Sequence, residues 1–335
     1  MSMNITVRLA RRPVGMPVAE DWQVSQEPMP MIGDGQFLLR TTFVSLDPAM
    51  RGWLDDRPSY LPPVAIGDVM RAGSVGEVTE SRHPKFPVGT MVMGTFGVQS
   101  YAVSDGRGVT RVDPALGSPS AYLGVLGITG LTAYFGLLVH GRPRPGDTVV
   151  VSGAAGAVGT VVGQMAKISG CRVIGIAGGA DKCRMIVQDL GFDAAIDYRD
   201  GSLRTALRAA AGDGIDVYFD NVGGDILNAA LANLAMHARV VICGAISQYN
   251  ADAPVPGPSN YLSLLVRRAS MEGFLVFDYE REYAVARRRL ATWVAQGRLK
   301  APETIVDAGI GDFHEVFMRL FTGDNVGKLV LAVRP

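Results

Sequence analysis

With 335 residues and 48% hydrophobic content, the chain is long enough for two domains and too apolar for a disordered or fibrous protein. Its 41 glycines are compatible with an α/β fold. The formal net charge is zero, so no overall field attracts nucleic acid or an anionic membrane, and we expect neither as a partner.

The N-terminal part of the chain, up to about residue 125, has the pattern of short strands separated by turns. Residues 37–46 predict a long strand, and residues 75–78 and 91–94 predict two more between proline and glycine turns. This pattern indicates a small, partly open β-barrel. Residues 126–135 then become helical in pattern.

A glycine-rich turn follows the apolar run 149–151 and precedes an amphipathic segment and a second apolar run, 173–176. The order strand, turn, helix, strand is that of a dinucleotide-binding unit, although an ordinary tight turn is the alternative for such a motif. Gly156 lets a pyrophosphate approach the backbone at the helix N-terminus, and Gly159 allows close helix–strand packing. The predicted cofactor contacts here are Gly153, Ala154, Ala155, Gly156, Ala157 and Val158, with Ala154 in the place of the usual first glycine.

The end of the second apolar run predicts which nucleotide is bound. An NAD site usually has an acidic residue there for the ribose 2′-hydroxyl. This chain has Gly178 instead, which leaves room for a 2′-phosphate, and Lys182, which offers a cation to it. We expect Asp181 to cap a helix that begins near Lys182. The site is therefore predicted to prefer NADP(H).

The remaining chain alternates between strands and helices, which favours a parallel sheet with right-handed crossovers. Strands are predicted at 194–197, 215–220, 239–243 and 273–277, and helices at 227–236 and 283–294. A last strand at 328–333 is expected to complete the N-terminal barrel, so that the cofactor domain is inserted within the other.

The cysteines and the N-terminus indicate the compartment. Cys171, Cys183 and Cys243 have no paired spacing and predict buried, inert thiols in a reducing environment. We find neither an apolar segment of signal-peptide type nor a run long enough to span a bilayer, and we expect a cytoplasmic protein.

Five segments in this order resemble the zinc-independent medium-chain dehydrogenase/reductases, most closely the prostaglandin reductase (leukotriene B4 12-hydroxydehydrogenase) group with its curcumin-reductase-like and plant double-bond-reductase-like relatives. They are SLDPAMRG at 45–52, GAAGAVG at 153–159, FDNVGG at 219–224, CGAISQYN at 243–250 and GDNVGK at 323–328.

The resemblance implies a GroES-like domain at 1–126, completed by 300–335, and a Rossmann NADP-binding domain at 127–299. It further implies NADPH-dependent reduction of the C=C bond of α,β-unsaturated ketones and aldehydes by a homodimer. Ala49 departs from the tyrosine that is common in the family and alters the expected substrate site. The cysteine and histidine ligands of the zinc-dependent relatives are missing from the pattern, so we expect no metal.

Tyr249 is the predicted catalytic residue. It follows the fifth strand of the predicted parallel sheet, at the carboxyl edge where ligands bind, and could donate a hydrogen bond to the substrate carbonyl oxygen. Two alternatives stay open: a tyrosine that packs or contacts the cofactor only, and donation by the cofactor ribose or by water.

The resemblance adds further cofactor contacts. Tyr198 would pack beside the adenine ribose phosphate, Asn221 would contact the cofactor, and Asn325 would reach it from the C-terminal segment, whereas a surface tyrosine and turn-forming asparagines are the alternatives. The nicotinamide half would meet Cys243, Gly244, Ala245, Ile246, Ser247, Phe274, Leu275 and Val276.

Four residues of the N-terminal region are candidates for the substrate pocket: Met50, Arg51, Tyr60 and Phe96. For Arg51 the commoner role is that of a structural arginine paired with a carboxylate, and core positions explain the two aromatic residues almost equally well. Two competing functions remain: a quinone reductase of the zeta-crystallin type, which the 47–48 and 244–249 segments disfavour, and a non-catalytic NADPH-binding sensor.

Overall fold

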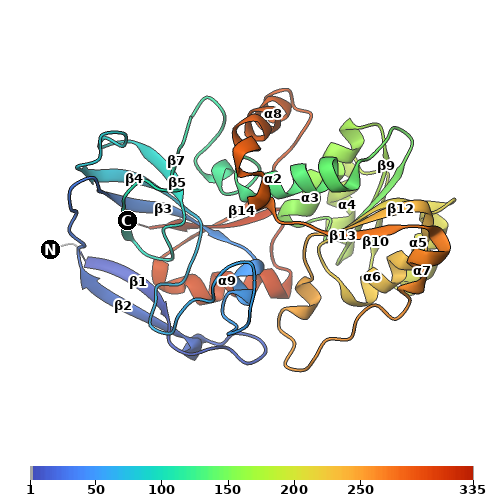
Figure 1. The fold of residues 1–335 in the computed structure, drawn as a ribbon, viewed down its shortest axis with the longest axis horizontal. Helices are drawn as coiled ribbons and strands as arrows, with labels where there is room; N and C mark the ends of the chain where they lie inside the picture. Colours follow the sequence, from blue (N-terminus) through green and yellow to red (C-terminus); the bar gives the residue numbers. More distant parts are fainter. Residues whose placement is uncertain (1–2, 335) are drawn as a thin grey trace. The chain divides into compact units, whose positions relative to one another are not determined.

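The computed structural model describes residues 3–334, in which the strands form three sheets (Figure 1). The chain divides into two compact units. The first comprises the residues up to 124 together with 303–325 and the segment from 329 onwards. The second comprises residues 125–302 and 326–328. No helix within the described residues combines the length and the apolar character that crossing a bilayer requires.

The first unit is built from antiparallel strands. Its larger sheet has the order β14-β15-β3-β4-β5-β7, with β6 also paired to β3, and a separate pair consists of β1 and β2. The strands are β1 (Met3–Leu9), β2 (Trp22–Pro28), β3 (Phe37–Leu46), β4 (Ser74–Ser81), β5 (Met91–Gly94), β6 (Tyr101–Ser104), β7 (Thr110–Arg111), β14 (Glu303–Ala308) and β15 (Lys328–Val333). The predicted strands at 37–46, 75–78 and 91–94 are confirmed.

The C-terminal strand completes this sheet, as the sequence predicts. Val330 of β15 pairs with Ser45 of β3 in an antiparallel ladder. The short α1 (Ala49–Gly52) follows β3, and α9 (Phe313–Thr322), which we did not predict, covers the unit's core. The ring of Phe313 meets Trp22 edge to face at 5.1 Å and stacks on Phe317 at 5.3 Å.

The second unit is a six-stranded sheet of order β10-β9-β8-β11-β12-β13, in which every pairing is parallel. This order is that of the doubly wound Rossmann fold and confirms the predicted fold class. Its strands are β8 (Thr148–Ser152), β9 (Arg172–Ala177), β10 (Ala194–Asp197), β11 (Ile215–Asp220), β12 (Leu234–Ile242) and β13 (Ser270–Gly273).

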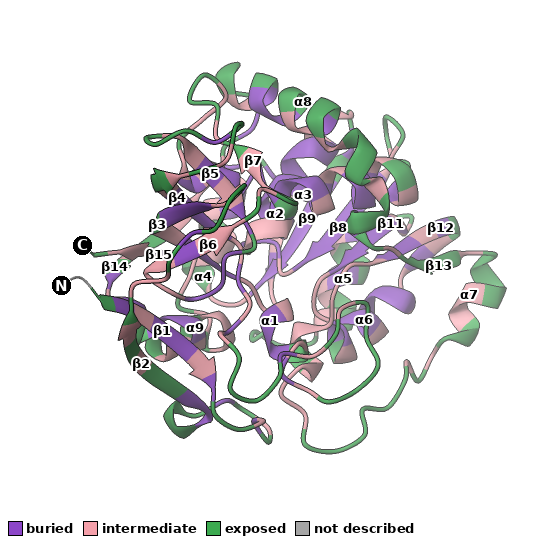
Figure 2. Ribbon diagram, turned by 60° about the vertical axis from the view of Figure 1, so that its left-hand side comes forward, coloured by how far each residue is buried: buried purple, intermediate pink, exposed green. Residues whose placement is uncertain are grey.

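Helices cover the sheet because its central strands are apolar on both sides, and Figure 2 shows β8, β9 and β11 largely buried. They are α2 (Ile128–Phe135), which continues into the π-helical turn η3 (Gly136–Gly141), α3 (Ala157–Ile168), α4 (Ala180–Gln188), α5 (Leu203–Ala211), α6 (Gly224–Leu231), α7 (Leu262–Arg267) and α8 (Tyr283–Ala295). The predicted helices at 126–135 and 283–294 are confirmed.

Two predicted segments are wrong. A strand is expected at 273–277, but the observed strand β13 ends at Gly273. Its neighbour β12 ends at the paired residue Ile242 and offers no partner for further strand residues. Residues 276–282 form the 3₁₀ segment η5 instead. The expected helix at 227–236 stops at Leu231, because β12 begins at Leu234 by pairing with Ile215, five residues before the predicted strand.

The start of α4 also differs from the prediction. The helix begins at Ala180, and its N-cap is Gly179, whose φ of 96° is disfavoured for a residue with a side chain. Asp181 is therefore not the cap. It lies in the first turn, where it forms an ion pair with Arg184.

Helix α3 lies so close to the second unit's core that one of its residues must be glycine. A Cβ on Gly163 would overlap the buried ring of Phe192. In an ordinary helix interior, glycine-to-alanine substitution stabilises by up to about 1 kcal/mol. We expect Gly163→Ala to lower the free energy of unfolding by about 1–3 kcal/mol through overpacking, measured by urea denaturation followed by circular dichroism.

Gly52→Ala is the matched control, because nothing lies within 4 Å of the added methyl group. It should leave the unfolding free energy unchanged or slightly raised. Stabilisation by Gly163→Ala to the same extent as by the control would contradict the packing argument.

Candidate functional site

The candidate site lies at the carboxyl edge of the parallel sheet, where the strand order reverses. Chain order runs outward from β8 to β10 on one side and from β11 to β13 on the other. In doubly wound sheets, ligands bind at this switch point. The glycine-rich turn follows β8, and Asn221 follows β11, so both lie at the reversal.

The glycine-rich turn has the geometry of an anion-binding helix start. Gly153 has a φ of 58°, and Gly156 is the N-cap of α3 and donates its N–H to the Gly153 carbonyl at 2.9 Å. A Cβ on Gly159 would overlap that same carbonyl oxygen. The amides of residues 157–159 precede the first intrahelical bond, from Thr160 N–H to Gly156 oxygen, and lie at the positive end of the helix dipole.

The substitution of alanine for the first fingerprint glycine is explained by packing. Ala154 is fully buried and donates its N–H to the Ile176 carbonyl of β9 at 3.0 Å. Its methyl group faces Gly175, where an added Cβ would lie 2.9 Å away. The neighbouring Ala155 carbonyl accepts the N–H of Gly327 at 2.8 Å, which brings the chain two residues beyond Asn325 to this turn.

The ends of β9 and β10 bring three of the predicted adenosine-end residues into one region. A Cβ on Gly178 would lie 2.8 Å from the Tyr198 ring, and Lys182 is half-buried in the first turn of α4. Arg199, which we did not predict, hydrogen-bonds the Tyr198 side chain, which raises the pKa of its guanidinium. A basic residue two positions after the third parallel strand was the available signal.

The Asp197 carboxylate at the end of β10 is occupied by backbone amides. The amides of Gly179 and Arg199 bond to Asp197 and lower the pKa of its carboxyl group, the Arg199 N–H at 3.0 Å. A ribose 2′-hydroxyl would need a carboxylate that accepts from it. Asp197 is thus engaged by the backbone, whereas Lys182 and Arg199 offer cations at this end.

A buried carboxylate organises the other side of the switch point. Asp220 is 1% exposed, and its Oδ1 accepts bonds from the Ser152 hydroxyl at 2.8 Å, the Tyr218 hydroxyl at 2.9 Å and the amides of Val222 and Gly223 at 3.1 and 3.0 Å. Burial, with Asp220 nearby, raises the pKa of Tyr218 well above its usual value, so this phenol stays protonated. The carboxylate therefore ties β8 to β11.

Asn221 and Cys243 extend this connection. The Asn221 side-chain amide donates to the Ser152 carbonyl at 2.7 Å, and its backbone N–H donates to the Ser152 hydroxyl at 2.9 Å. Cys243 and Gly244 both donate their N–H groups to the Asp220 carbonyl. Burial raises the pKa of the Cys243 thiol to about 12, so it is not a nucleophile.

Tyr249 folds back over the loop that carries it. Its hydroxyl accepts the Ala245 N–H at 3.1 Å, and a Cβ on Gly244 would lie 2.9 Å from the same oxygen. Ile246 and Ser247 fix the loop by donating their N–H groups to the carbonyls that follow β11, each at 3.2 Å. A hydroxyl that accepts an amide proton is a stronger donor through its own hydrogen.

The segment Phe274–Val276 emerges next to this loop. Ile242 of β12 is paired with Gly273 of β13, so the chains beyond them leave the sheet side by side. Val276 is buried, and its carbonyl accepts the Tyr283 hydroxyl at 2.9 Å. The predicted segments 243–247 and 274–276, from two distant parts of the sequence, thus start side by side.

The four predicted substrate residues all belong to the first unit and differ in what they offer. Met50 and Phe96 are buried in its two cores. Arg51 is 2% exposed, and its guanidinium bonds Asp55 at 2.7 Å and the Gly15 carbonyl at 3.0 Å, which is the structural role that the sequence left open. Tyr60 is 45% exposed and accepts the Trp53 indole N–H at 3.3 Å.

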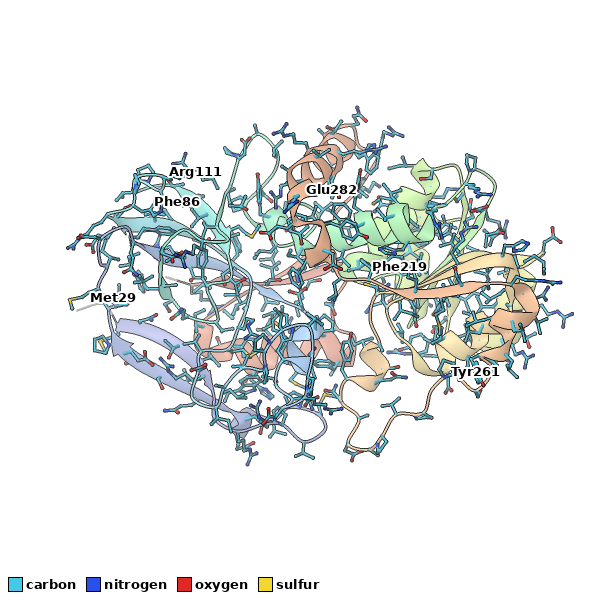
Figure 3. The ribbon with its side chains drawn as sticks, viewed as in Figure 1. Met29, Phe86, Arg111, Phe219, Tyr261 and Glu282 are labelled. Atoms are coloured by element: carbon cyan, nitrogen blue, oxygen red, sulfur yellow. The ribbon has the colours of Figure 1, made fainter. Side chains whose placement is uncertain are left out.

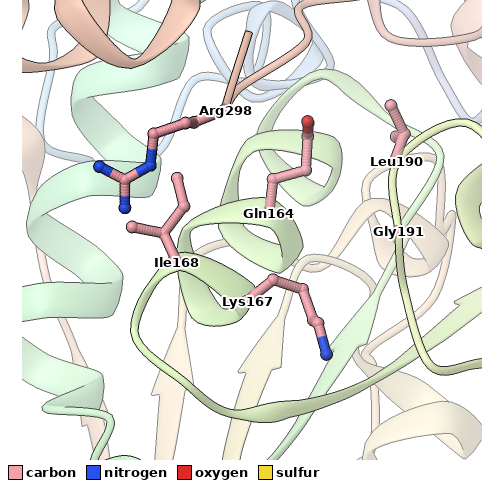
Figure 4. Close-up of a pocket in the computed structure, with 6 residues that line it drawn as sticks. All are labelled: Gln164, Lys167, Ile168, Leu190, Gly191 and Arg298. Carbon is pink, nitrogen blue, oxygen red and sulfur yellow. The ribbon is translucent and has the colours of Figure 1, made fainter. Parts of the chain in front are cut away.

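A surface hollow of about 360 Å³ lies elsewhere, beside the C-terminal half of α3 (Figure 4). Its lining includes Lys167, whose ammonium group pairs with Asp193 at 2.8 Å. The predicted site lies at the opposite end of this helix. Over residues 3–334, we find no group of three or more His, Cys, Asp or Glu side chains that could hold a metal ion.

Comparison with known proteins places this geometry in a family. Residues 6–112 match a family model described as the N-terminal domain of oxidoreductase, and residues 157–292 match one described as zinc-binding dehydrogenase. The chain is 42% identical over 330 residues to the NADPH-dependent curcumin reductase of Escherichia coli, covering 97% of this chain and 95% of that protein.

It is 40% identical over 319 residues to rabbit (Oryctolagus cuniculus) prostaglandin reductase 1, covering 94% of this chain and 89% of that protein. The structure matches that of CurA from Vibrio vulnificus in complex with NADPH with a TM-score of 0.93, 42% identity and 99% coverage of both chains. Such identity over nearly the whole length, together with both domain matches, shows that the chain belongs to the zinc-independent medium-chain dehydrogenase/reductases, in the group of the prostaglandin and curcumin reductases.

Proposed function

We propose that this protein uses NADPH to reduce the C=C bond of α,β-unsaturated ketones and aldehydes. The observation that carries the proposal is the Tyr249 hydroxyl, which folds over Gly244 and Ala245 at the carboxyl edge of a dinucleotide-binding sheet. A related enzyme from Escherichia coli is an NADPH-dependent curcumin reductase by name, and a structural relative was crystallised with NADPH.

NADP(H) fits the residues of the second unit. The amides at the start of α3 suit a pyrophosphate, and the absence of a side chain at Gly156 lets it approach. Lys182 and Arg199 would pair with the 2′-phosphate beside Tyr198. Asn221 would contact the cofactor through the backbone that its side chain positions, and Asn325 would reach it from the C-terminal segment.

The nicotinamide half would lie along residues 243–247 and 274–276. Bound NADPH supplies a hydride to the β-carbon of the substrate. Tyr249 would donate its hydroxyl proton in a hydrogen bond to the carbonyl oxygen, where negative charge collects, while the Ala245 N–H polarises that hydroxyl. The buried Asp220 network would hold the loop in place without exchanging a proton with the substrate.

Among the four substrate candidates of the first unit, Tyr60 is the exposed aromatic residue. We propose the barrel domain at 1–126 with 300–335, the NADP-binding domain at 127–299, and a homodimer as the working form. Ala49, in place of a larger residue, would admit bulkier substrates near α1.

The decisive experiment is NADPH oxidation at 340 nm with an alkenal, an aryl enone and a quinone, each repeated with NADH. We expect turnover of the alkenal and the enone with NADPH, and a saturated carbonyl product by mass spectrometry. Turnover of the quinone alone would show that the protein is a quinone reductase instead. Tight NADPH binding without turnover of any acceptor would show that it is a non-catalytic NADPH sensor.

Removal of either cation at the adenosine end should change cofactor preference. We expect Lys182→Ala and Arg199→Ala each to lower kcat/KM for NADPH by about 10- to 100-fold, because a charge-assisted bond to the 2′-phosphate contributes about 1.5–3 kcal/mol. The value for NADH, which has no such phosphate, should stay within about twofold. Steady-state kinetics with both cofactors measure this.

Arg208→Ala, which removes an exposed arginine on α5, is the matched control and should change neither value. Equal losses with NADPH and NADH in the Lys182 and Arg199 variants would contradict a role at the 2′-phosphate.

The Tyr249 hydroxyl should act on the chemical step. We expect Tyr249→Phe to lower kcat by about 100-fold, the usual effect of removing an oxyanion donor, with a much smaller change in KM for NADPH. Tyr261→Phe, which removes an exposed hydroxyl from the same unit, is the control. An unchanged kcat with a raised KM for NADPH would leave Tyr249 as a cofactor contact only.

A further inference from the structure

One histidine, one glutamate and one tyrosine form a cluster in the second unit that includes none of the predicted site residues. The Nδ1 atom of His140 lies 3.0 Å from Glu272 Oε1, and its Nε2 atom lies 2.8 Å from the Tyr279 hydroxyl. The imidazole also stacks on the Phe274 ring, with the ring centres 5.0 Å apart. The His140 side chain is 11% exposed.

Both ring nitrogens of His140 have a partner in the cluster. With its proton on Nδ1, His140 donates to the Glu272 carboxylate and accepts the Tyr279 hydroxyl proton at Nε2. Tyr279 keeps that proton, because burial first, and then Asp278, Glu272 and Glu282, raise its pKa. His140 therefore links Glu272 to Tyr279 through its two ring nitrogens.

His140 contacts the chain before and after the short irregular segment that contains Leu275 and Val276. Glu272 and Phe274 precede these two residues, and Tyr279 follows them, so one imidazole fixes both ends of the segment.

A second set of contacts fixes the same segment to α2 and η3. The Tyr279 ring stacks on Phe135 with centres 4.5 Å apart. Gly136 has no Cβ, and one added there would overlap the Phe274 ring and lie 2.8 Å from Phe219, which is labelled in Figure 3.

The held segment leaves the sheet beside the Tyr249 loop, because Ile242 and Gly273 are register partners at the ends of β12 and β13. We propose that His140 is a positioning residue that holds Phe274–Val276 against the nicotinamide half of NADPH. This inference rests on the proposed function. The cluster lies beside β13, at one edge of the sheet, whereas the adenosine end is built from α4 and from β9 and β10 at the opposite edge.

The test compares two ligands that share the adenosine end. Adenosine 2′,5′-bisphosphate carries the 2′-phosphate but has no nicotinamide. By isothermal titration calorimetry, we expect His140→Ala to weaken NADPH binding about tenfold, the effect of losing a bond to a charged group, and to leave the bisphosphate within about twofold. Lys182→Ala should weaken both ligands.

Two further variants separate positioning from folding. Tyr279→Phe keeps the stack on Phe135 and removes only the hydroxyl. It should therefore lower the affinity for NADPH by about threefold and leave the affinity for the bisphosphate unchanged. His140→Gln keeps a polar group that can reach Tyr279 and should recover part of the NADPH affinity. His314→Ala, which removes a histidine bonded to Trp22 in the first unit, is the matched control and should change neither ligand.

Three outcomes would overturn the inference. Equal losses for NADPH and the bisphosphate in the His140 and Tyr279 variants would show only a general structural role. Unchanged NADPH binding in both variants would show that the segment needs no such support. The third outcome is that the unaltered protein binds the bisphosphate but not NADPH, which would contradict the placement of the nicotinamide. Binding of neither ligand would instead contradict the proposed function itself.

Discussion

The Asp220 carboxylate is the interaction on which the candidate site depends. A buried carboxylate is costly unless donors surround it, and here the donors come from β8, from β11 and from the turn that follows β11. The same residue's carbonyl receives the first two amides after β12. One residue thereby fixes the ends of three strands relative to one another. The glycine-rich turn and the Tyr249 loop start at two of these ends, so their positions depend on it as well.

Much of this arrangement could be predicted from the sequence, because its signals are local. Apolar runs between glycines predict β8 and β9, and the spacing of Gly156 and Gly159 predicts the start of α3. The boundaries of β12 and β13 could not be predicted. They depend on which strand lies alongside, and the apolar residues from Phe274 to Val276 satisfy a strand pattern while packing in an irregular segment.

The site shows the same division. Lys182 and Tyr198 follow from position along the chain. Arg199 also had a positional signal, a basic residue shortly after a predicted strand, but its bond to the Tyr198 side chain is evident only in the structure. Arg51 illustrates the converse, since the sequence left two roles open and its buried bonds to Asp55 and Gly15 identify the structural one. Asp220 gave no sequence signal of its role, because an aspartate at a strand end is common in turns.

The pairing of β15 with β3 has a consequence for biosynthesis. A ribosome releases the chain from its N-terminus, and domains generally fold as units while they emerge. The first sheet contains β15, which follows all strands of the parallel sheet in the chain, so it cannot be completed until β15 has left the ribosome. The parallel sheet lies almost wholly within one continuous stretch and can assemble earlier. During synthesis, the edge of β3 that β15 will cover therefore stays unpaired until β15 has emerged, and an unpaired strand edge can pair with another chain.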